Sequence, residues 1–225
     1  AVTLVAPAIP SMAIDLKADS NITQLVLTTL LLSIAFGQLI VGPLSDRLGR
    51  KPLFLGGAVA FCAAGFGAAF SHTIEGIIFF RVIQGFGAAA AVAMSRSIVV
   101  DFYGLDRAAG VMSTIIAMMA IIPVFGTALG GVLTDLVGWQ GSFWMLAFTG
   151  LILIYFVNAE IQETHKPEQV FTFKDALAGY ANLLSTAKFL SPALTTAFQT
   201  AVFFAMMGFI GYSFEPVSYT HLTLP

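Results

Sequence analysis

Long apolar runs alternate with short polar stretches along this chain of 225 residues. A helix needs about 20 mostly apolar residues to cross a bilayer. Runs of this kind occupy 22–44, 52–70, 74–102, 108–133, 141–159 and 191–214. The shorter run 1–14 is typical of the second half of such a helix. These runs are too continuous for barrel strands, so the pattern predicts one partial helix, five full helices and a seventh near the end.

The segment 160–190 is more polar than the rest, but its apolar residues recur with a helical period. They are Phe173, Leu177, Tyr180 and Leu184. Thr172 and Asp175 form an N-terminal capping pattern at the start of this stretch. The pattern predicts an amphipathic helix, which either lies along the membrane interface or serves as an ordinary linker.

Basic residues are unevenly distributed among the connections between the runs. Only Lys17 lies in the connections after the first, third and fifth runs. The other connections carry Arg47, Arg50, Lys51, Arg107, Lys166, Lys174 and Lys188. Because basic loops stay in the cytoplasm, we expect a multi-pass protein of the cell inner membrane with a cytoplasmic N-terminus.

The composition narrows the functional classes. Hydrophobic residues make up 58% of the chain and charged residues 10%, which is typical of membrane proteins. The net charge of -2 does not indicate nucleic-acid binding, and the single Cys62 excludes an internal disulfide. The three histidines, His72, His165 and His221, lack metal-ligand spacing. Ala1 already lies in an apolar run without a basic leader before it, so we expect a truncated first helix rather than a signal peptide.

The stretch "GPLSDRLGRK" (42–51) concentrates charge between two apolar runs. A basic membrane anchor would explain Arg47, Arg50 and Lys51. It would not explain Asp46, which lies between two turn glycines.

The stretch "GPLSDRLG" (42–49) has a counterpart in "GVLTDLVG" (131–138), where Gly, Leu, a hydroxyl residue, Asp and Gly stand at the same spacing. The second stretch lies three helices later and on the opposite predicted side of the membrane. Such a recurrence is typical of an inverted three-helix repeat, and a chance match is the alternative explanation.

Arg81 lies within an apolar run, about 12 Å from its predicted outer start. A guanidinium at that depth costs about 2.5–3.5 kcal/mol on insertion scales, so it should face protein or water. Small and polar residues follow at helical spacing: Gln84, Ala88, Ala91 and Ser95. We interpret this stripe as the wall of a substrate or proton pathway, with snorkelling of Arg81 toward the interface as the alternative.

Glycines inside two runs indicate close helix packing. "GFGAAA" (85–90) superficially matches a dinucleotide fingerprint, but it lies within a span and not between a strand and a helix. In the run 108–133, a proline that bends the helix precedes small residues. These residues are Pro123, Gly126, Gly130 and Gly131.

Several of these segments together resemble one family of transporters. "GPLSDRLGRK" resembles the loop signature of the major facilitator superfamily, G-x-L-[SA]-D-R-x-G-R-[RK]. "RVIQGFGAA" (81–89) resembles its fourth-helix motif, and "PVFGTALGG" (123–131) resembles the fifth-helix motif of its antiporter branch. With "APAIPSMAIDL" (6–16), the chain resembles the drug:proton antiporters of the Bcr/CflA type.

The resemblance implies an all-α membrane protein with the N-terminal six-helix half of a twelve-helix fold plus helix seven. The half would span 1–159 with its first helix truncated, and 160–190 would be a cytoplasmic loop between the halves. Helix seven would span 191–215. The last residues, 216–225, resemble a translated sequencing-adapter tail, and we expect them to be non-native.

In the resembled family, the turn at 42–51 is a conformational latch that holds one state of the transport cycle. The residues carried over to it are Gly42, Asp46, Arg47, Gly49 and Arg50. Asp101, at the end of the run 74–102, is their natural partner in this chain. The glycine-rich stretch after Pro123 would seal the pathway against leak, although ordinary packing also explains it.

Three positions depart from the resembled pattern. Thr127 replaces a proline, and Gln140 replaces an arginine after Trp139. Thr3 lies where many relatives have an acidic residue, so no proton carrier is visible near the start of the chain.

We therefore expect a secondary active transporter that exports small amphipathic compounds in exchange for protons by alternating access. The alternatives are a carrier for a sugar or another metabolite and, more distantly, a membrane-embedded enzyme. An enzyme would need a nucleophile with a base or a metal cluster, and the runs contain neither histidines nor paired carboxylates. The expected partners are a small-molecule substrate, protons and the lipid bilayer. We expect a monomer without cofactor, metal or nucleic acid.

Overall fold

A computed structural model describes residues 1–164 and 173–220, and every regular element in these residues is helical. Because these elements are all helices, the predicted all-α class is confirmed. The chain forms two compact units, Ala1–Phe171 and Thr172–Pro225. Among the described residues, the four helices α3 to α6 are long and apolar enough to cross a membrane. The bounds of the longer helices are α3 Ser20–Leu48, α4 Arg50–Ala69, α5 Ile74–Val137 and α6 Gln140–Glu160.

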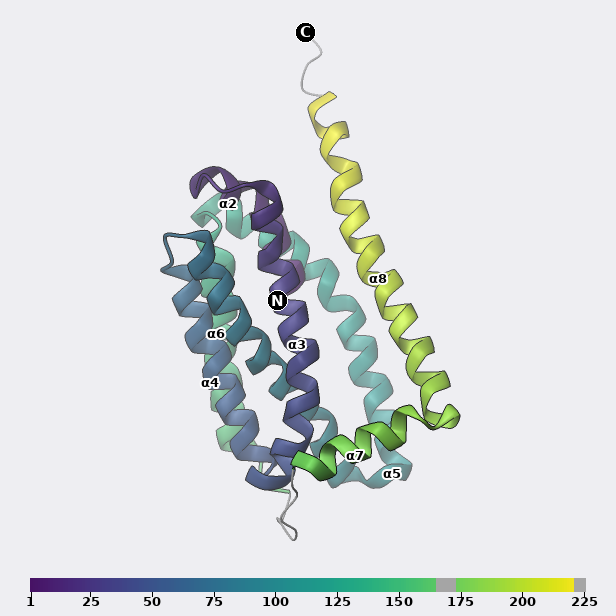
Figure 1. The fold of residues 1–225 in the computed structure, drawn as a ribbon. Helices are drawn as coiled ribbons and strands as arrows, with labels where there is room; N and C mark the ends of the chain where they lie inside the picture. The colour runs from purple at the N-terminus through teal and green to yellow at the C-terminus, as the bar shows by residue number, and fades with distance from the viewer. Residues whose placement is uncertain (165–172, 221–225) are drawn as a thin grey trace. The chain divides into compact units, whose positions relative to one another are not determined.

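The predicted run 1–14 is helical but not as one regular helix. Helix α1 (Val2–Val5) leads into the 3-10 helix η1 (Ala6–Ala8) and then into α2 (Ile9–Asp15). Pro7 and Pro10 lie at or near the starts of η1 and α2, and neither has an N–H to donate to the preceding turn. The N-terminus lies beside the middle of α3, and this segment ends at the connection that leads into α3 (Figure 1).

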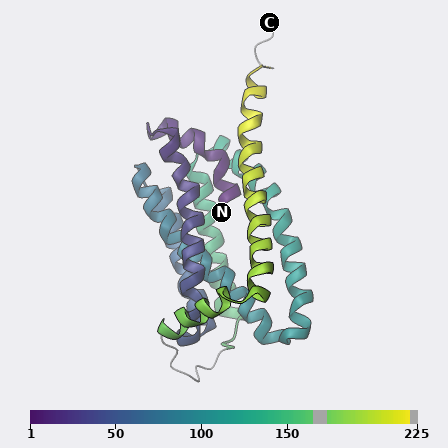
Figure 2. The ribbon, with the colours of Figure 1, turned by 45° about the vertical axis from the view of Figure 1, so that its right-hand side comes forward.

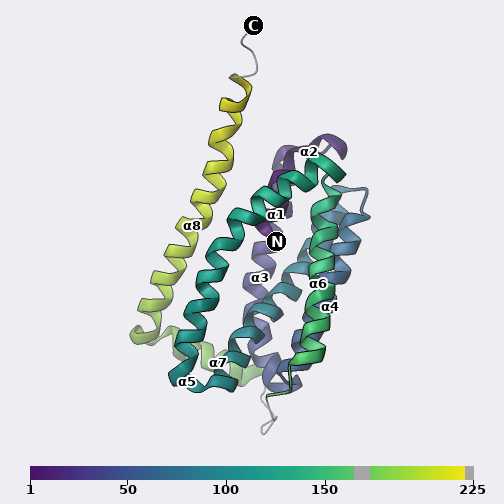
Figure 3. The ribbon, with the colours of Figure 1, turned by 180° about the vertical axis from the view of Figure 1, so that it is seen from behind.

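Helix α5 contains two of the predicted spans. Its backbone leaves the helical region at Gly104, with φ 70° and ψ 164°. This single residue separates a first arm (74–103) from a second arm (105–137), and Figure 3 shows the two arms diverging from that point. The sequence predicted a connection over 103–107, which is longer than the one observed. A glycine with positive φ makes the break possible within one residue.

Small residues hold the bundle together where helix backbones approach each other. The first arm of α5 packs against both α3 and α4, and α4 packs against α6. A Cβ added to Gly57 of α4 would lie 2.5 Å from the Cβ of Ala90, and one added to Gly37 of α3 would lie 2.7 Å from the Cβ of Ala89. The stretch "GFGAAA" thus packs helices, as predicted, and no strand precedes it in the described chain.

The second unit contains α7 (Phe173–Leu184), which a short turn joins to α8 (Ala187–Thr220) (Figure 2). A helix is present where the amphipathic pattern predicted one. Its predicted cap at Thr172 and the basic residue Lys166 lie outside the described residues. Helix α8 continues past 215 as backbone, and the assignment of 216–225 as a non-native tail stays a prediction.

Candidate functional site

The α3–α4 turn is built around one glycine. Gly49 has φ 93° and ψ 162°, a conformation that residues with a Cβ rarely adopt. Its N–H donates to the carbonyl of Ser45 at 2.9 Å, which closes α3. The hydroxyl of the buried Ser45 donates in turn to the carbonyl of Gly42 at 2.7 Å. Helix α4 begins at the next residue, so the charged side chain of Arg50 is held close to the end of α3.

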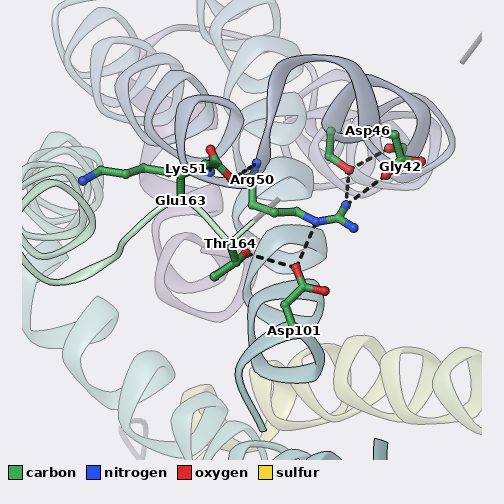
Figure 4. Close-up of polar contacts among 8 residues, drawn as sticks. Gly42, Asp46, Arg50, Lys51, Asp101, Glu163 and Thr164 are labelled. Carbon is green, nitrogen blue, oxygen red and sulfur yellow. Dashed lines mark hydrogen bonds and ion pairs between the residues drawn. The ribbon is translucent and has the colours of Figure 1, made fainter. Parts of the chain in front are cut away.

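Arg50 connects the ends of two helices to the α3–α4 turn. Its Nη1 lies 3.2 Å from Oδ1 of Asp46 in α3, and its Nε lies 3.3 Å from Oδ2 of Asp101 in α5 (Figure 4). Nη1 also donates to Oγ of Ser45. The Arg50 side chain is 16% exposed and that of Asp101 is 28% exposed, so solvent screens the pairs only in part. The two carboxylates pair with different nitrogens of the same guanidinium, and this fixes the orientation of the guanidinium plane.

The structure therefore brings together Asp46, Gly49, Arg50 and Asp101, four of the six residues predicted for the latch. Gly42 joins them only through its backbone carbonyl. Arg47 is exposed, and its side chain makes no polar contact among the described residues. We use the name latch below for the cluster of Asp46, Arg50 and Asp101.

Sequence reasoning missed a second layer of contacts around the latch. The carboxylate of Glu163 accepts hydrogen bonds from the backbone N–H of Arg50 at 3.0 Å and of Lys51 at 3.2 Å. Thr164 donates to Oδ2 of Asp101 at 3.0 Å (Figure 4). One feature indicates that such a contact is needed: α4 has no side-chain N-cap of its own, so its first N–H groups require a partner from elsewhere in the chain. The sequence does not indicate which distant acidic residue provides it.

Arg81 lies in the first arm of α5, and it is completely buried in the bundle. Its Nη1 donates to Oε1 of Gln84 at 2.7 Å. Its guanidinium carbon lies 4.9 Å from the ring centroid of Phe143 in α6, within reach of a cation–π interaction. Among the described residues, its Nε and Nη2 and the Nε2 of Gln84 lack hydrogen-bond partners. The side chain thus faces the protein interior and does not snorkel outward in this structure.

The other residue predicted for the pathway lies apart from this pair. Ser95 is half-buried and donates to the carbonyl of Val92 at 2.9 Å. It lies eleven positions after Gln84, which corresponds to about 16 Å along a helix. Among the described residues, Arg81 and Gln84 are therefore the only members of the predicted stripe that bond directly to each other.

The glycines predicted for the antiporter bend allow α1 to approach the second arm of α5. A Cβ on Gly126 would lie 2.7 Å from Oγ1 of Thr3, and one on Gly130 would overlap the carbonyl of Leu4. A Cβ on Gly131 would meet nothing within 4 Å. Pro123 lies within the helix, and its carbonyl accepts a hydrogen bond from Oγ1 of Thr127 at 2.9 Å.

The described residues contain no group of three or more histidine, cysteine, aspartate or glutamate side chains able to hold a metal. The chemistry of the site thus consists of charge pairs at one end of the bundle and a buried cation with amide donors inside it.

Comparison with known proteins identifies the family. Residues 1–224 match the sequence profile of the Major Facilitator Superfamily. A chloramphenicol resistance protein of Pseudomonas aeruginosa is 38% identical over 149 residues, which cover 66% of this chain and 35% of that protein. A bicyclomycin resistance protein homolog of Haemophilus influenzae is 31% identical over 162 residues, covering 72% of this chain and 41% of that protein.

A further relative, the multidrug resistance protein MdtM of Escherichia coli O157:H7, is 27% identical over 93% of this chain and 51% of its own length. The chain spans about half the length of these relatives or less. The profile match covers almost every residue, including the charged turn at 42–51 and the helices that it joins. The chain therefore belongs to the Major Facilitator Superfamily.

Proposed function

We propose that this chain is part of a transporter that exports small amphipathic organic compounds, drugs among them, in exchange for protons. It would provide the N-terminal six-helix half and helix seven, and substrate would bind between this half and the other near the bilayer midplane. The names of the relatives, which include resistance to chloramphenicol and to multiple drugs, support this substrate class.

The observation that carries the proposal is the double pairing of Arg50 with Asp46 and Asp101. A cluster that joins helix ends through one guanidinium stabilises one arrangement of those helices. When the helices separate, at least one pair must break, and the partly buried charges must then find water or new partners. Such a cluster can favour one side of an alternating-access cycle, which is the role proposed for the latch.

The interior pair of Arg81 and Gln84 supports a role in coupling. Arginine remains charged at working pH, so Arg81 does not itself carry the proton. Among the described residues, its Nε and Nη2 lack hydrogen-bond partners, and the N–H groups of these two nitrogens are suited to a carboxylate, which accepts a bidentate pair of hydrogen bonds. A carboxylate that alternates between this guanidinium and a proton would couple substrate movement to proton movement.

Residues 123–131 would limit the leak of protons and substrate through the pathway, because they hold α1 close to α5.

The uneven distribution of basic residues among the connections supports a cytoplasmic position for the latch, and we propose that the protein lies in the inner membrane. We propose a monomer as the working unit, because a two-half transporter forms its pathway within one chain.

The test uses the full-length transporter that contains these residues, expressed in bacteria without their own efflux pumps. We expect cells to accumulate several-fold less chloramphenicol and less of a cationic dye than cells with empty vector, and a protonophore should abolish the difference. Asp46→Asn should accumulate drug at near the empty-vector level with equal amounts of protein in the membrane. Drug accumulation equal to the vector control, combined with saturable uptake of a sugar, would replace the proposal with a metabolite carrier.

A further inference from the structure

Two helix ends of opposite polarity lie side by side at the latch. The N-terminus of α4 has free N–H groups and a partial positive charge, whereas the C-terminus of α6 has free carbonyls and a partial negative charge. Glu163, three residues after α6, accepts hydrogen bonds from the N–H groups of Arg50 and Lys51. The Nζ of Lys51 donates in the opposite direction, to the carbonyl of Asn158 in the last turn of α6 at 3.0 Å. Each helix end thus satisfies some of the free groups of the other: two N–H groups of α4 and one carbonyl of α6.

The turn leaves room for Glu163 because residue 49 has no side chain. A Cβ on Gly49 would lie 3.0 Å from Cδ of Glu163, which is closer than ordinary contact. Gly49 therefore serves two purposes, since it provides the positive φ of the turn and the space for a carboxylate from α6.

The next residue reaches the other side of the same cluster. Thr164 donates to Oδ2 of Asp101, the oxygen that also accepts from Nε of Arg50. Residues 161–164, which we call the α6 tether, therefore hold both members of the Arg50–Asp101 pair. Glu163 fixes the backbone from which Arg50 extends, and Thr164 orients the carboxylate of its partner (Figure 4).

We propose that Glu163 and Thr164 of the α6 tether are positioning residues of the latch, so that the latch closes only while the tether lies against α4 and Asp101. This inference rests on the proposed function of the latch. The tether is also the beginning of the segment that leads toward α7. A displacement of residues 161–164 would withdraw the two side chains together and free Arg50 from Asp101.

The first experiment measures the cap itself, without transport. In the full-length transporter in lipid nanodiscs, hydrogen exchange is followed by mass spectrometry for the peptide that includes Arg50 and Lys51. Glu163→Ala should accelerate exchange at these amides about tenfold, in line with the loss of a helix N-cap. The matched control is Glu160→Ala, which removes the same charge from the exposed end of α6, where the side chain of Glu160 makes no polar contact among the described residues. Equal exchange in both variants would overturn the proposal.

The second experiment asks whether the tether acts through the latch. Drug efflux is measured for Glu163→Gln, for Asp101→Asn and for the double variant at equal expression. If Glu163 acts by positioning Arg50 for Asp101, each single variant should lower efflux and the double variant should be no worse than Asp101→Asn alone. Independent structural damage would multiply the two losses, and that outcome would overturn the proposal. Unchanged efflux in Glu163→Gln would overturn it as well.

Thr164→Val retains the shape of the side chain and removes only the hydrogen bond to Asp101, so it replaces Glu163→Gln if that variant does not reach the membrane. The results distinguish a failure of the latch in the proposed function from a failure of the tether as its positioning element. Unchanged efflux in Asp101→Asn would remove the latch from the proposed function, whereas accelerated exchange in Glu163→Ala would still show the cap. Reduced efflux in Asp101→Asn with normal exchange and efflux in both tether variants would remove only the tether.

Discussion

Arg81 is buried at a position where an ionised side chain is costly, and the described structure satisfies it only in part. One N–H bonds to Gln84, and the face of Phe143 offers a further electrostatic contact. An unpaired buried donor costs about 1–3 kcal/mol, more when charged, so the remaining N–H groups raise the energy of this arrangement. A bound carboxylate would recover that energy, and under the proposed function Arg81 would then favour the state in which the carboxylate is paired with it.

Replacing Arg81 tests whether its planar fork matters or only its charge. We expect Arg81→Lys in the full-length transporter to lose at least about tenfold in drug efflux, nearly as much as Arg81→Ala. Lysine retains the charge but cannot bond two carboxylate oxygens side by side, and losing a charged hydrogen bond costs about 1.5–3 kcal/mol. Efflux is measured in inverted vesicles at several pH values and at equal expression. Wild-type rates with an unchanged pH profile in Arg81→Lys would exclude Arg81 from the coupling mechanism.

Sequence patterns predicted the position of Arg81 but not that of Glu163, and the reason is physical. Arg81 interrupts an apolar run, so its depth in the membrane follows from counting residues. Glu163 lies in a polar stretch where a carboxylate is unremarkable, and its partners in α4 are more than a hundred residues earlier in the chain. Only the packing of α4 against α6 brings them together.

At the scale of helices, glycines set the distances between backbones. Gly56 and Gly57 are neighbours in α4 but face different surroundings. A Cβ on Gly57 would lie 3.0 Å from the carbonyl oxygen of Gly87, as well as close to Ala90, whereas one on Gly56 would meet nothing within 4 Å. The helical period places Gly57 against the first arm of α5 and turns Gly56 away from it.

This pair allows a controlled test of close packing. Gly57→Val should destabilise the bundle by about 1–3 kcal/mol through overpacking, because the obstructing atoms belong partly to the backbone of α5 and cannot rotate away. Gly56→Val introduces the same residue with the same helix propensity and should leave stability near the wild-type value. Thermal unfolding of the purified protein in detergent compares the two. Equal melting temperatures for the two variants would show that the α4–α5 contact tolerates a side chain.

The connection within α5 shows what periodicity does not reveal about elements. The apolar pattern predicted two spans, and both are present in the two arms of α5. It predicted the break over 103–107, between the apolar runs 74–102 and 108–133. The structure places the break at Gly104 alone. Polar residues can remain helical at the end of a bundle, whereas the left-handed conformation of one glycine ends the helix.

For the whole first unit, the echo between 42–49 and 131–138 has a structural counterpart. Gly49 ends α3 with φ 93°, and Gly138 ends α5 with φ 81°. Their N–H groups donate to the carbonyls of Ser45 and Thr134, at 2.9 and 3.1 Å. In both cases the next helix begins within two residues. Since the chain crosses the bundle three times between them, these turns lie at opposite ends, which favours the inverted-repeat interpretation over chance.

Only the first of these turns carries basic residues, and this difference predicts the orientation of the whole unit. Helix α4, about 30 Å long, separates the latch end from the connection that contains His72. Leu48 and His72 are both exposed, so a cysteine at either position should react with a maleimide that can reach it. The background variant Cys62→Ser removes the native thiol, which is only 5% exposed.

In intact cells that produce the full-length transporter, we expect an impermeant maleimide to label His72→Cys and not Leu48→Cys. After permeabilisation, both should be labelled, which controls for reactivity at each site. The physical reason is that Arg47, Arg50 and Lys51 would retain the latch end in the cytoplasm, whereas the His72 connection has no lysine or arginine to retain it. Labelling of Leu48→Cys in intact cells would place the latch outside. Asp46 and Asp101 would then hold a state closed to the exterior, and the direction proposed for the transport cycle would be reversed.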